Sequence, residues 1–522
     1  MRRFLLVLWA SLACMASCGG EVPPPPEPEV NPSEPEVPEV RELLAPGDLS
    51  VKRTEEGVVL TWKDLSTLEE GYLVEKQHAS ESKAVSFFLP ANTTSWTDPA
   101  FTSGITRYRV ASYWHLDRSE FAGATFEEYA APQVKLRSVE ASYHMVACEV
   151  EVVSDGGAPV RCGVLRSREG EEPQELPFAG PLSSGKCGWV LSEDLEAGVS
   201  YQFTPFAEYS GGRVYGEART AERLPAPEPV VVAWELVTSA PELEIRKAST
   251  DVLGHPVNLW CAVADFTQGS LELRTTLAGS LTEPGVYIRE QLAGEEVLVL
   301  VNGGYFASPA SSYSYVCDRG VKKASNVSSL TRTDVYSVTR GFFGTDAEGV
   351  MVVGWQSGDG FYNAPLPVYD GGPVLSLSSG LPVVEGWQPY SAIGGGPVLL
   401  KGGAYCFDFL KSREGYYLSN HELFQADIFA DGLRAPRTAV GTDGAGRVCL
   451  LVADGRGSGG STGLTLDELA RIMAGLGCTD VLNLDGGGSS AFLTGSEGTL
   501  RNHPSDGHER KVLSYVSIMR RR

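Results

Sequence analysis

Three apolar runs of the sequence each end in polar residues and glycines. The runs cover residues 297–301, 448–453 and 481–484, and their composition predicts buried β-strands. A polar residue directly after a buried strand lies at the end of a sheet, where glycines let a ligand approach the main chain. Carboxylates in such a place can act as a nucleophile or a base. The residues that follow the three runs are Asn302 to Phe306, Asp454 to Arg456 and Asp485 to Ser490.

An Asp-Gly pair also marks an ordinary turn, so these aspartates need to be compared with one another. Asp443-Gly444 is interpreted as a turn because it only joins two apolar strands. Asp485 is followed by three glycines and two serines, which is more than a turn requires. Asp485 is therefore the first candidate for a catalytic carboxylate, and Asp454 is the second.

The segment between the second and third runs predicts a helix. Thr465 is a good N-cap with Glu468 at the capping-box position, leucines follow at helical spacing, and Gly477 ends the pattern. Strand, helix and strand within about forty residues form a βαβ unit. If both strands belong to one sheet, they run parallel, and Asp454 and Asp485 emerge at the same edge.

The glycines in this segment also fit a weaker pattern. Gly455, Gly457 and Gly460 have the spacing of a dinucleotide-binding loop, but the helix should open at the glycines and Thr465 lies five residues further on. Dinucleotide binding is therefore kept only as a lower-ranked alternative.

Several motifs taken together resemble the phosphodiester glycosidase family. They are Asn302 to Phe306, Gly394 to Leu399, Pro436 to Gly441, Asn483 to Ser490, the helix from Leu464 to Ala470, and the tail from Asn502 to Asp506 leading to Glu509 and Arg510. The resemblance covers about residues 230–522. Tyr305 and Cys478 depart from the usual residues at their positions without threatening the resemblance.

The resemblance implies hydrolysis of a sugar-1-phosphodiester at the anomeric carbon, with release of free sugar, such as N-acetylglucosamine, and a phosphomonoester. The substrate would be a phosphorylated glycan or an envelope polymer. A phosphomonoester has its second pKa near ~6 and is a fair leaving group, so it needs its charge held more than it needs a general acid. The planar guanidinium of Arg437 can grip two phosphate oxygens, and glycine amides can form an anion-binding nest. A carboxylate must also face the anomeric carbon.

These requirements assign roles to residues. Asp485 is expected to be the nucleophile or base, with Asp454 second or as a ligand of a metal or a sugar hydroxyl. A structural salt bridge is the alternative for Arg437. The candidate catalytic residues are Asp485, Asp454, Arg437 and Asn302, and the candidate substrate- and phosphate-binding residues are Gly303, Gly304, Thr438, Asn483, Gly486, Gly487, Gly488, Ser489, Glu509 and Arg510.

Other features of the site stay open in the sequence. Glu509 and Arg510 match the family tail, but they can also pair with each other. No cofactor with a defined ligand set is predicted; clustered Asp and Asn oxygens keep Ca²⁺ as an alternative. His255, His503 and His508 are scattered and are interpreted as surface or packing residues, with substrate contact an alternative for His503. A non-catalytic glycan-binding or exopolysaccharide-assembly lipoprotein is the alternative function.

The chain before residue 226 predicts export and two β-sandwiches. Residues 1–18 resemble a lipoprotein signal peptide with lipidation at Cys18, and the Pro- and Glu-rich residues 19–45 form a disordered tether. This predicts an exported, membrane-anchored lipoprotein facing the periplasm or the cell surface, with the outer membrane preferred. Residues 46–131 resemble a fibronectin type III domain, 132–225 a second immunoglobulin-like sandwich, and 226–522 an α+β phosphodiester glycosidase domain with a mixed sheet.

Charge and cysteine content narrow the classes further. The chain has 522 residues and a formal net charge of -23, so its surface would repel nucleic acid, which is not an expected partner. Cys148, Cys162 and Cys187 lie close enough in sequence for one disulfide among them, whereas Cys449 and Cys478 are expected to be buried thiols.

Overall fold

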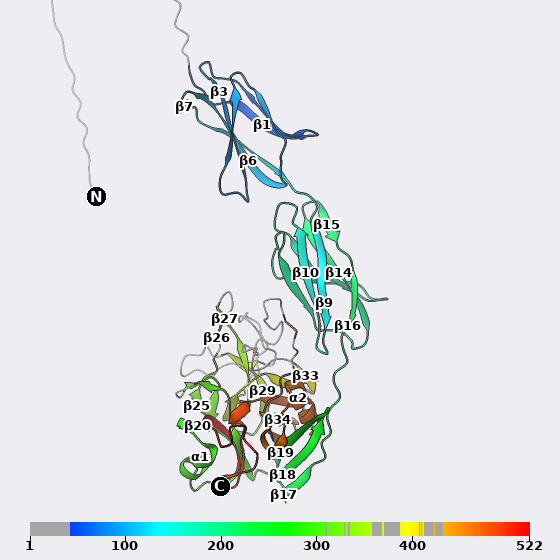
Figure 1. The fold of residues 1–522 in the computed structure, drawn as a ribbon, viewed down its shortest axis with the longest axis vertical. Helices are drawn as coiled ribbons and strands as arrows, with labels where there is room; N and C mark the ends of the chain where they lie inside the picture. Colours follow the sequence, from blue (N-terminus) through cyan, green and yellow to red (C-terminus); the bar gives the residue numbers. More distant parts are fainter. Residues whose placement is uncertain are drawn as a thin grey trace, which may run out of the picture. The chain divides into compact units, whose positions relative to one another are not determined.

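The computed structural model describes residues 42–521, except for 308–310, 328, 332–334, 358–367, 370–386, 407, 409, 412–421 and 423–431. The predicted signal peptide with Cys18, and most of the tether, lie outside the described residues. The chain divides into two compact units, residues 1–127 and 128–522 (Figure 1). The predicted domain boundaries stay predictions.

The first unit consists of two antiparallel sheets. One has the order β1-β2-β5, and the other has the order β4-β3-β6-β7, with β8 also pairing with β6. Trp62, Tyr72 and Tyr108 lie in the core between them. The strands are β1 (Gly47–Thr54), β2 (Gly57–Lys63), β3 (Gly71–His78), β4 (Val85–Pro90), β5 (Ser95–Asp98), β6 (Gly104–Trp114), β7 (Asp117–Arg118) and β8 (Ala122–Glu128).

The second unit begins with another pair of antiparallel sheets. Their orders are β13-β10-β9 and β12-β11-β14-β15, with β16 pairing with β14. Cys148 and Cys162 are buried in the core between the sheets, and every described cysteine is a free thiol, so the expected disulfide is not formed. The strands are β9 (Gln133–Ala141), β10 (Val146–Ser154), β11 (Arg161–Ser167), β12 (Gln174–Pro177), β13 (Cys187–Ser192), β14 (Ser200–Tyr209), β15 (Gly212–Tyr215) and β16 (Arg219–Glu222).

An eight-stranded sheet forms the centre of the remaining chain, with the order β17-β18-β19-β35-β34-β36-β32-β33. Figure 1 shows β17, β18 and β19 side by side; β35, from much later in the chain, pairs with β19, and β34 follows β35 in the sheet. The strands are β17 (Glu235–Ala240), β18 (Leu243–Val252), β19 (His255–Asp265), β32 (Val398–Lys401), β33 (Ala404–Tyr405), β34 (Arg437–Thr442), β35 (Arg447–Ala453) and β36 (Asp480–Asn483).

Two further sheets have the orders β20-β39-β21-β37-β38 and β25-β24-β31-β28-β29-β30. The strands of the first are β20 (Leu271–Thr282), β21 (Val297–Asn302), β37 (Phe492–Thr494), β38 (Thr499–Leu500) and β39 (Val512–Arg520). Those of the second are β24 (Val316–Asp318), β25 (Val321–Ala324), β28 (Thr339–Thr345), β29 (Met351–Ser357), β30 (Val368–Tyr369) and β31 (Ser391–Gly394). Two short hairpins complete the description, β22 (Phe306–Ala307) with β23 (Ser311–Ser312), and β26 (Ser329–Thr331) with β27 (Val335–Ser337).

The apolar run of β35 is continuous because both faces of the eight-stranded sheet are covered. Cys449, Leu451 and Ala453 belong to the core beneath α2 (Leu466–Gly475). Residues 448, 450 and 452 belong to a second core, which they share with β20, β21 and β39 of the five-stranded sheet. Alternate side chains of a strand point to opposite faces, so burial on both faces requires an apolar residue at every position.

Strands β35 and β36 belong to one sheet, but they do not pair with each other. Both strands pair with β34, which lies between them and is antiparallel to each. They therefore point in the same direction, and their carboxyl ends reach the same edge of the sheet, but they are not neighbours. The expected common edge of Asp454 and Asp485 is thus present, through a different topology.

The α+β mixed-sheet expectation also needs correction. Within the described parts of these sheets, all pairings between named strands are antiparallel. The described residues contain only two α-helices, α1 (Pro284–Gln291) and α2. The protein is therefore mostly β and multidomain, and helices cover only part of its sheets.

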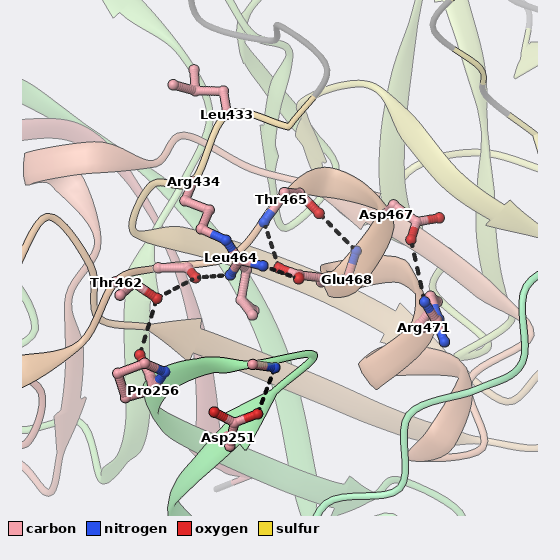
Figure 2. A network of polar contacts seen from close by, with 12 residues as sticks. Asp251, Pro256, Leu433, Arg434, Thr462, Leu464, Thr465, Asp467, Glu468 and Arg471 are labelled. Atoms are coloured by element: carbon pink, nitrogen blue, oxygen red, sulfur yellow. Dashed lines mark hydrogen bonds and ion pairs between the residues drawn. The ribbon is translucent and has the colours of Figure 1, made fainter.

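Helix α2 begins as the sequence predicts. Thr465 Oγ1 accepts from the Glu468 amide at 3.1 Å, and the Glu468 carboxylate accepts from the Thr465 amide at 3.0 Å (Figure 2). Glu468 also forms an ion pair with Arg434, which precedes β34. The N-cap therefore connects the helix to the strand that lies between β35 and β36.

Replacing Thr465 tests how much this N-cap contributes to the free energy of unfolding. Thr465→Ala removes the acceptor for the Glu468 amide and should destabilise the protein by about 1 kcal/mol, whereas Thr465→Ser keeps the hydroxyl and should lose much less. Thermal unfolding of both variants tests this, and equal losses in both would show that the hydroxyl is not the stabilising group.

Candidate active site

The site lies at the edge of the eight-stranded sheet where β34 begins. Arg437, the first residue of β34, pairs with Ala453, the last residue of β35. On the other side, the Leu484 amide donates to Thr438 O at 2.8 Å. The register therefore brings the chain after β35 and the chain after β36 to the two sides of Arg437.

Asn302 joins this edge to the five-stranded sheet. It ends β21, its side chain is 1% exposed, and its Oδ1 accepts from Thr438 Oγ1 at 2.8 Å and from the Ala491 amide at 3.2 Å. Its Nδ2 donates to the main-chain oxygen of Asp485 at 2.6 Å. Asn302 therefore fixes the position of the Asp485 main chain. Its own side chain is bonded within the protein and does not face a sugar.

The amides after Asn302 do not form the expected anion nest. Gly303 N–H donates to Ser514 O at 2.7 Å, and Gly304 N–H donates to Ser514 Oγ at 3.1 Å. A Cβ atom on either glycine would collide with atoms of Ser514 or Ser314. These glycines are needed for close packing between strands, and their amides are already used.

Asp485 sits in the turn that follows β36, with part of its surface accessible. Burial raises the pKa of its carboxyl to about 6, although the Ser489 hydroxyl, the Gly486 amide and the positive charge of Arg510 all favour the ionised form. Gly486 N–H donates to Asp485 Oδ1 at 2.9 Å. A carboxylate with this pKa can take up and release a proton near neutral pH.

The glycines after Asp485 let the turn pack closely against β34 and against two arginines. Gly487 N–H donates to Pro436 O at 2.9 Å. A Cβ atom on Gly487 would lie 3.1 Å from Nη2 of Arg456, and one on Gly488 would overlap the Arg510 guanidinium. At least one of the expected nest amides, that of Gly487, is therefore committed to the fold.

Arg437 is buried, with 3% of its surface exposed, and it is not part of a salt bridge within the described residues. Its Nε donates to Leu464 O at 3.1 Å and its Nη2 to Leu433 O at 3.0 Å. Burial, with a smaller contribution from the nearby charge of Arg456, lowers its pKa to about 10. Both of these partners are main-chain carbonyls, which do not neutralise a guanidinium. The salt bridge that was the alternative role for Arg437 is therefore not formed among the described residues.

Asn483, two residues before Asp485, forms a second polar pair with Tyr305. Asn483 Nδ2 donates to the Tyr305 hydroxyl at 2.8 Å and to Gly396 O at 2.9 Å. The Tyr305 hydroxyl donates to Gly396 O at 2.7 Å, and burial raises the pKa of this phenol. Asn483 Oδ1 is buried and accepts no hydrogen bond from any described residue.

Asp454 is directed toward the C-terminal tail. Its Oδ1 accepts from Asn502 Nδ2 at 3.0 Å and from the His503 amide at 2.9 Å, and its Oδ2 lies 3.1 Å from His503 Nδ1. Burial raises its pKa. A buried carboxylate with both oxygens engaged is better suited to orienting His503, whose side chain is 63% exposed, than to attacking a sugar.

The remaining tail residues have separate partners. Glu509 Oε2 accepts from the Gly285 amide in the first turn of α1 at 2.6 Å, whereas the guanidinium of Arg510 pairs with Asp506 at 2.8 Å. Glu509 and Arg510 therefore do not pair with each other. Arg510 remains part of the site because its charge acts on Asp485, and Glu509 supports α1 instead.

Several residues near this edge had no role predicted from the sequence. Arg456 follows Asp454-Gly455 and Tyr305 lies within the motif from Asn302 to Phe306, so their proximity to predicted site residues was the available signal. Arg340 and Glu422 are buried, and their charges act on the Tyr305 phenol. No local pattern marks either of them.

The arrangement favours anion chemistry over dinucleotide binding, and calcium binding stays a prediction. Among the described residues, no group of three or more His, Cys, Asp or Glu side chains is placed to hold a metal ion. Helix α2 begins at Leu466, well after Gly460, and its first turn is capped by Thr465. The helix end is therefore not open to a phosphate, as a dinucleotide site requires. The guanidinium groups can bind a phosphate, and the nearby carboxylate with its raised pKa can act at the adjacent carbon.

Comparison with known families agrees with this chemistry. Residues 295–519 match the family model described as phosphodiester glycosidase. The match includes every strand end and turn that forms the edge of the site, from Asn302 to Arg510.

Curated relatives match only short stretches. The SPbeta prophage-derived uncharacterized protein YomE of Bacillus subtilis (strain 168) is 37% identical over 95 residues, which are 18% of this chain and 14% of that protein. The N-acetylglucosamine-1-phosphodiester alpha-N-acetylglucosaminidase of Mus musculus is 43% identical over 70 residues, which are 13% of each chain. The aligned part thus spans about one seventh of the length of these relatives.

Solved structures give weak overall similarity. A hypothetical protein from Synechocystis aligns with a TM-score of 0.37 and 14% identity, covering 92% of this chain and 100% of that chain. A two-domain fibronectin type III segment of chicken tenascin aligns with a TM-score of 0.23 and 14% identity, covering 34% of this chain and 98% of that chain.

Removing the Asn302 side chain should destabilise the protein. Asn302→Ala leaves the Asp485 carbonyl and the Ala491 amide without their partner, which should lower the free energy of unfolding by about 1–3 kcal/mol. Ser249→Ala removes a single exposed hydrogen bond, to Asn258, and should change it by less than about 0.5 kcal/mol. Similar thermal unfolding of both variants and the parent protein would contradict the role given to Asn302.

Proposed function

We propose that this sheet edge hydrolyses sugar-1-phosphodiesters at the anomeric carbon, releasing free sugar and a phosphomonoester. The observation that carries the proposal is the placement of Asp485, with its pKa of about 6, on a turn that packs against β34 beside the buried cation Arg437. The family match over residues 295–519 supports the same reaction class.

The leaving group explains why one carboxylate is enough. Cleavage breaks the bond between the anomeric carbon and the phosphate oxygen, and the phosphate keeps the electron pair. A phosphomonoester leaves without strong protonation because its second pKa is near ~6. The protein therefore needs cations at the phosphate more than a general acid, and Arg437 and Arg510 are the candidates for holding the phosphate charge.

Asp485 supplies the other requirement. In its ionised form it can attack the anomeric carbon or take a proton from the attacking water. The hydroxyl of Ser489 and the amide of Gly486 stabilise that ionised form. The oxygen of water forms the new bond to the anomeric carbon, directly or after a covalent intermediate, so the free sugar gains a hydroxyl group.

Asn483 is proposed to contact the sugar. Its Oδ1 is an acceptor without a donor among the described residues, and it is held rigidly by the bonds that its Nδ2 makes to Tyr305 and Gly396. A sugar hydroxyl or the amide of an N-acetyl group would satisfy it. Release of N-acetylglucosamine from a glycan or an envelope polymer is the form of the reaction that we propose.

The attachment of the protein to a membrane is proposed separately from its activity. Among the described residues, neither helix has the length and apolar composition needed to cross a bilayer. We propose attachment through lipidated Cys18, followed by the Pro- and Glu-rich tether, because residues 1–18 resemble a lipoprotein signal. A role that only binds glycans without cleaving them is the competing outcome in the experiment below.

Asp485→Asn should lower kcat by about 10²- to 10⁴-fold on a methyl diester of N-acetylglucosamine 1-phosphate, measured as released reducing sugar. In the parent protein, kcat should rise with pH to a plateau, with its midpoint at about 6, because only ionised Asp485 is active. Asp443→Asn, the other Asp-Gly turn at the opposite end of β34, should keep the parent profile.

A parent protein that binds the diester in a thermal-shift assay without releasing sugar would support the binding role instead.

The raised pKa of Asp485 also affects the stability of the folded protein. The native carboxyl binds its proton more tightly than the unfolded one, so Asp485 makes the protein less stable as pH rises from about 4 to about 6. Asp485→Asn should remove that part of the pH dependence of the melting temperature.

A further inference from the structure

Arg456 lies over the glycine turn that follows Asp485. It comes directly after Asp454-Gly455, beyond the end of β35, and its guanidinium packs on Gly487, where an added Cβ atom would lie 3.1 to 3.3 Å from Nη2, Nη1 and Cζ. Gly487 has φ 62°, so any side chain there would be strained as well. The left-handed φ thus favours glycine at this position, and the absence of a side chain leaves room for the guanidinium to pack on the turn.

The backbone of Arg456 is itself unusual. Its φ of 57° places a non-glycine residue in the left-handed region, which is unfavourable and is typically retained where a side chain must be directed to a particular place. The side chain is exposed and is not part of any ion pair or hydrogen bond between described residues. Arg510, on the neighbouring glycine, differs because it is paired with Asp506.

Arg437 lies directly beneath this turn. Gly487 N–H donates to the oxygen of Pro436, the residue before Arg437. The two guanidinium groups are close enough for the charge of Arg456 to lower the pKa of Arg437. Within the described residues neither of them has a carboxylate partner. Two like charges in such a place repel each other, and an anion that contacts both would remove the repulsion.

We infer that Arg456 is a second phosphate-binding residue, which together with Arg437 forms a site for a doubly charged phosphate group. The inference rests on the proposed function only for the identity of the natural ligand. Two cations attract a dianion more strongly than a monoanion. At neutral pH a phosphomonoester carries close to two negative charges, because its second pKa is near ~6, whereas a phosphodiester carries one.

The charge difference has a consequence for turnover. The phosphomonoester that leaves the anomeric carbon gains charge as the bond breaks, so the two arginines favour the product-like state over the bound diester. This stabilises the leaving group in the transition state. The same preference means that the phosphomonoester product, and inorganic phosphate, should compete with the substrate for the site.

Calorimetric titration of the purified protein with inorganic phosphate at pH 7.5 tests the inference directly. Arg456→Ala should weaken phosphate binding at least about tenfold, and Arg456→Lys should retain part of the affinity because it keeps the charge but loses the planar fork. Lys323→Ala is the matched control, because it removes an exposed positive charge on β25, in a different sheet, and should bind phosphate as the parent does. Dimethyl phosphate, a monoanion, should bind the parent protein more weakly than inorganic phosphate.

The outcomes separate the inference from the proposed reaction. Phosphate binding that depends on Arg456 supports the inference, even if the protein releases no sugar from a phosphodiester, a result that would remove only the proposed function. Sugar release together with equal phosphate affinity in the parent protein and Arg456→Ala would overturn the inference and leave the function standing. A parent protein without measurable phosphate binding, or with equal affinity for dimethyl phosphate, would also overturn it.

Discussion

The hydrogen bonds of Asn302 are the constraint on which the site depends. Its side chain connects the end of β21 to Thr438 on β34 and to the main chain of Asp485, so two sheets meet at one buried amide. An asparagine is suited to this place because it offers a donor and an acceptor on one rigid group, and a buried amide must have both satisfied. The main chain of Asp485 is thus held by a buried side chain from another sheet, and its carboxylate is bonded locally by the Gly486 amide.

The electrostatics of the edge follow from burial. Packing raises the pKa of Asp485 and lowers that of Arg437, so each charged form is held at a cost in this environment. The protein does not place the two groups in one salt bridge, which would neutralise both. A carboxylate and a guanidinium that are kept apart can instead act on different parts of one ligand, the anomeric carbon and the phosphate, and this separation is typical of a functional site.

Local signals explain how much of the fold the sequence predicts. The strands β21, β35 and β36 are recognisable because burial on both faces requires uninterrupted apolar residues, and the start of α2 is recognisable because Thr465 and Glu468 cap it through neighbouring backbone groups. The order of strands in the sheet is not local. The antiparallel strand β34 lies between β35 and β36 because it pairs with both of them. The βαβ pattern of the sequence does not reveal this strand.

The residue types that end the buried strands can be read without a structure, and they make Asp485, Arg437 and the glycine turn candidates for acting on an anion. How each residue is used depends on contacts made in the folded protein. Ser514, far beyond Gly303 in the chain, accepts hydrogen bonds from the amides of Gly303 and Gly304, and Asn502 and His503 engage the carboxylate of Asp454. Hydrogen bonds between residues so distant in sequence depend on how the sheets pack, and no spacing or composition encodes that packing locally.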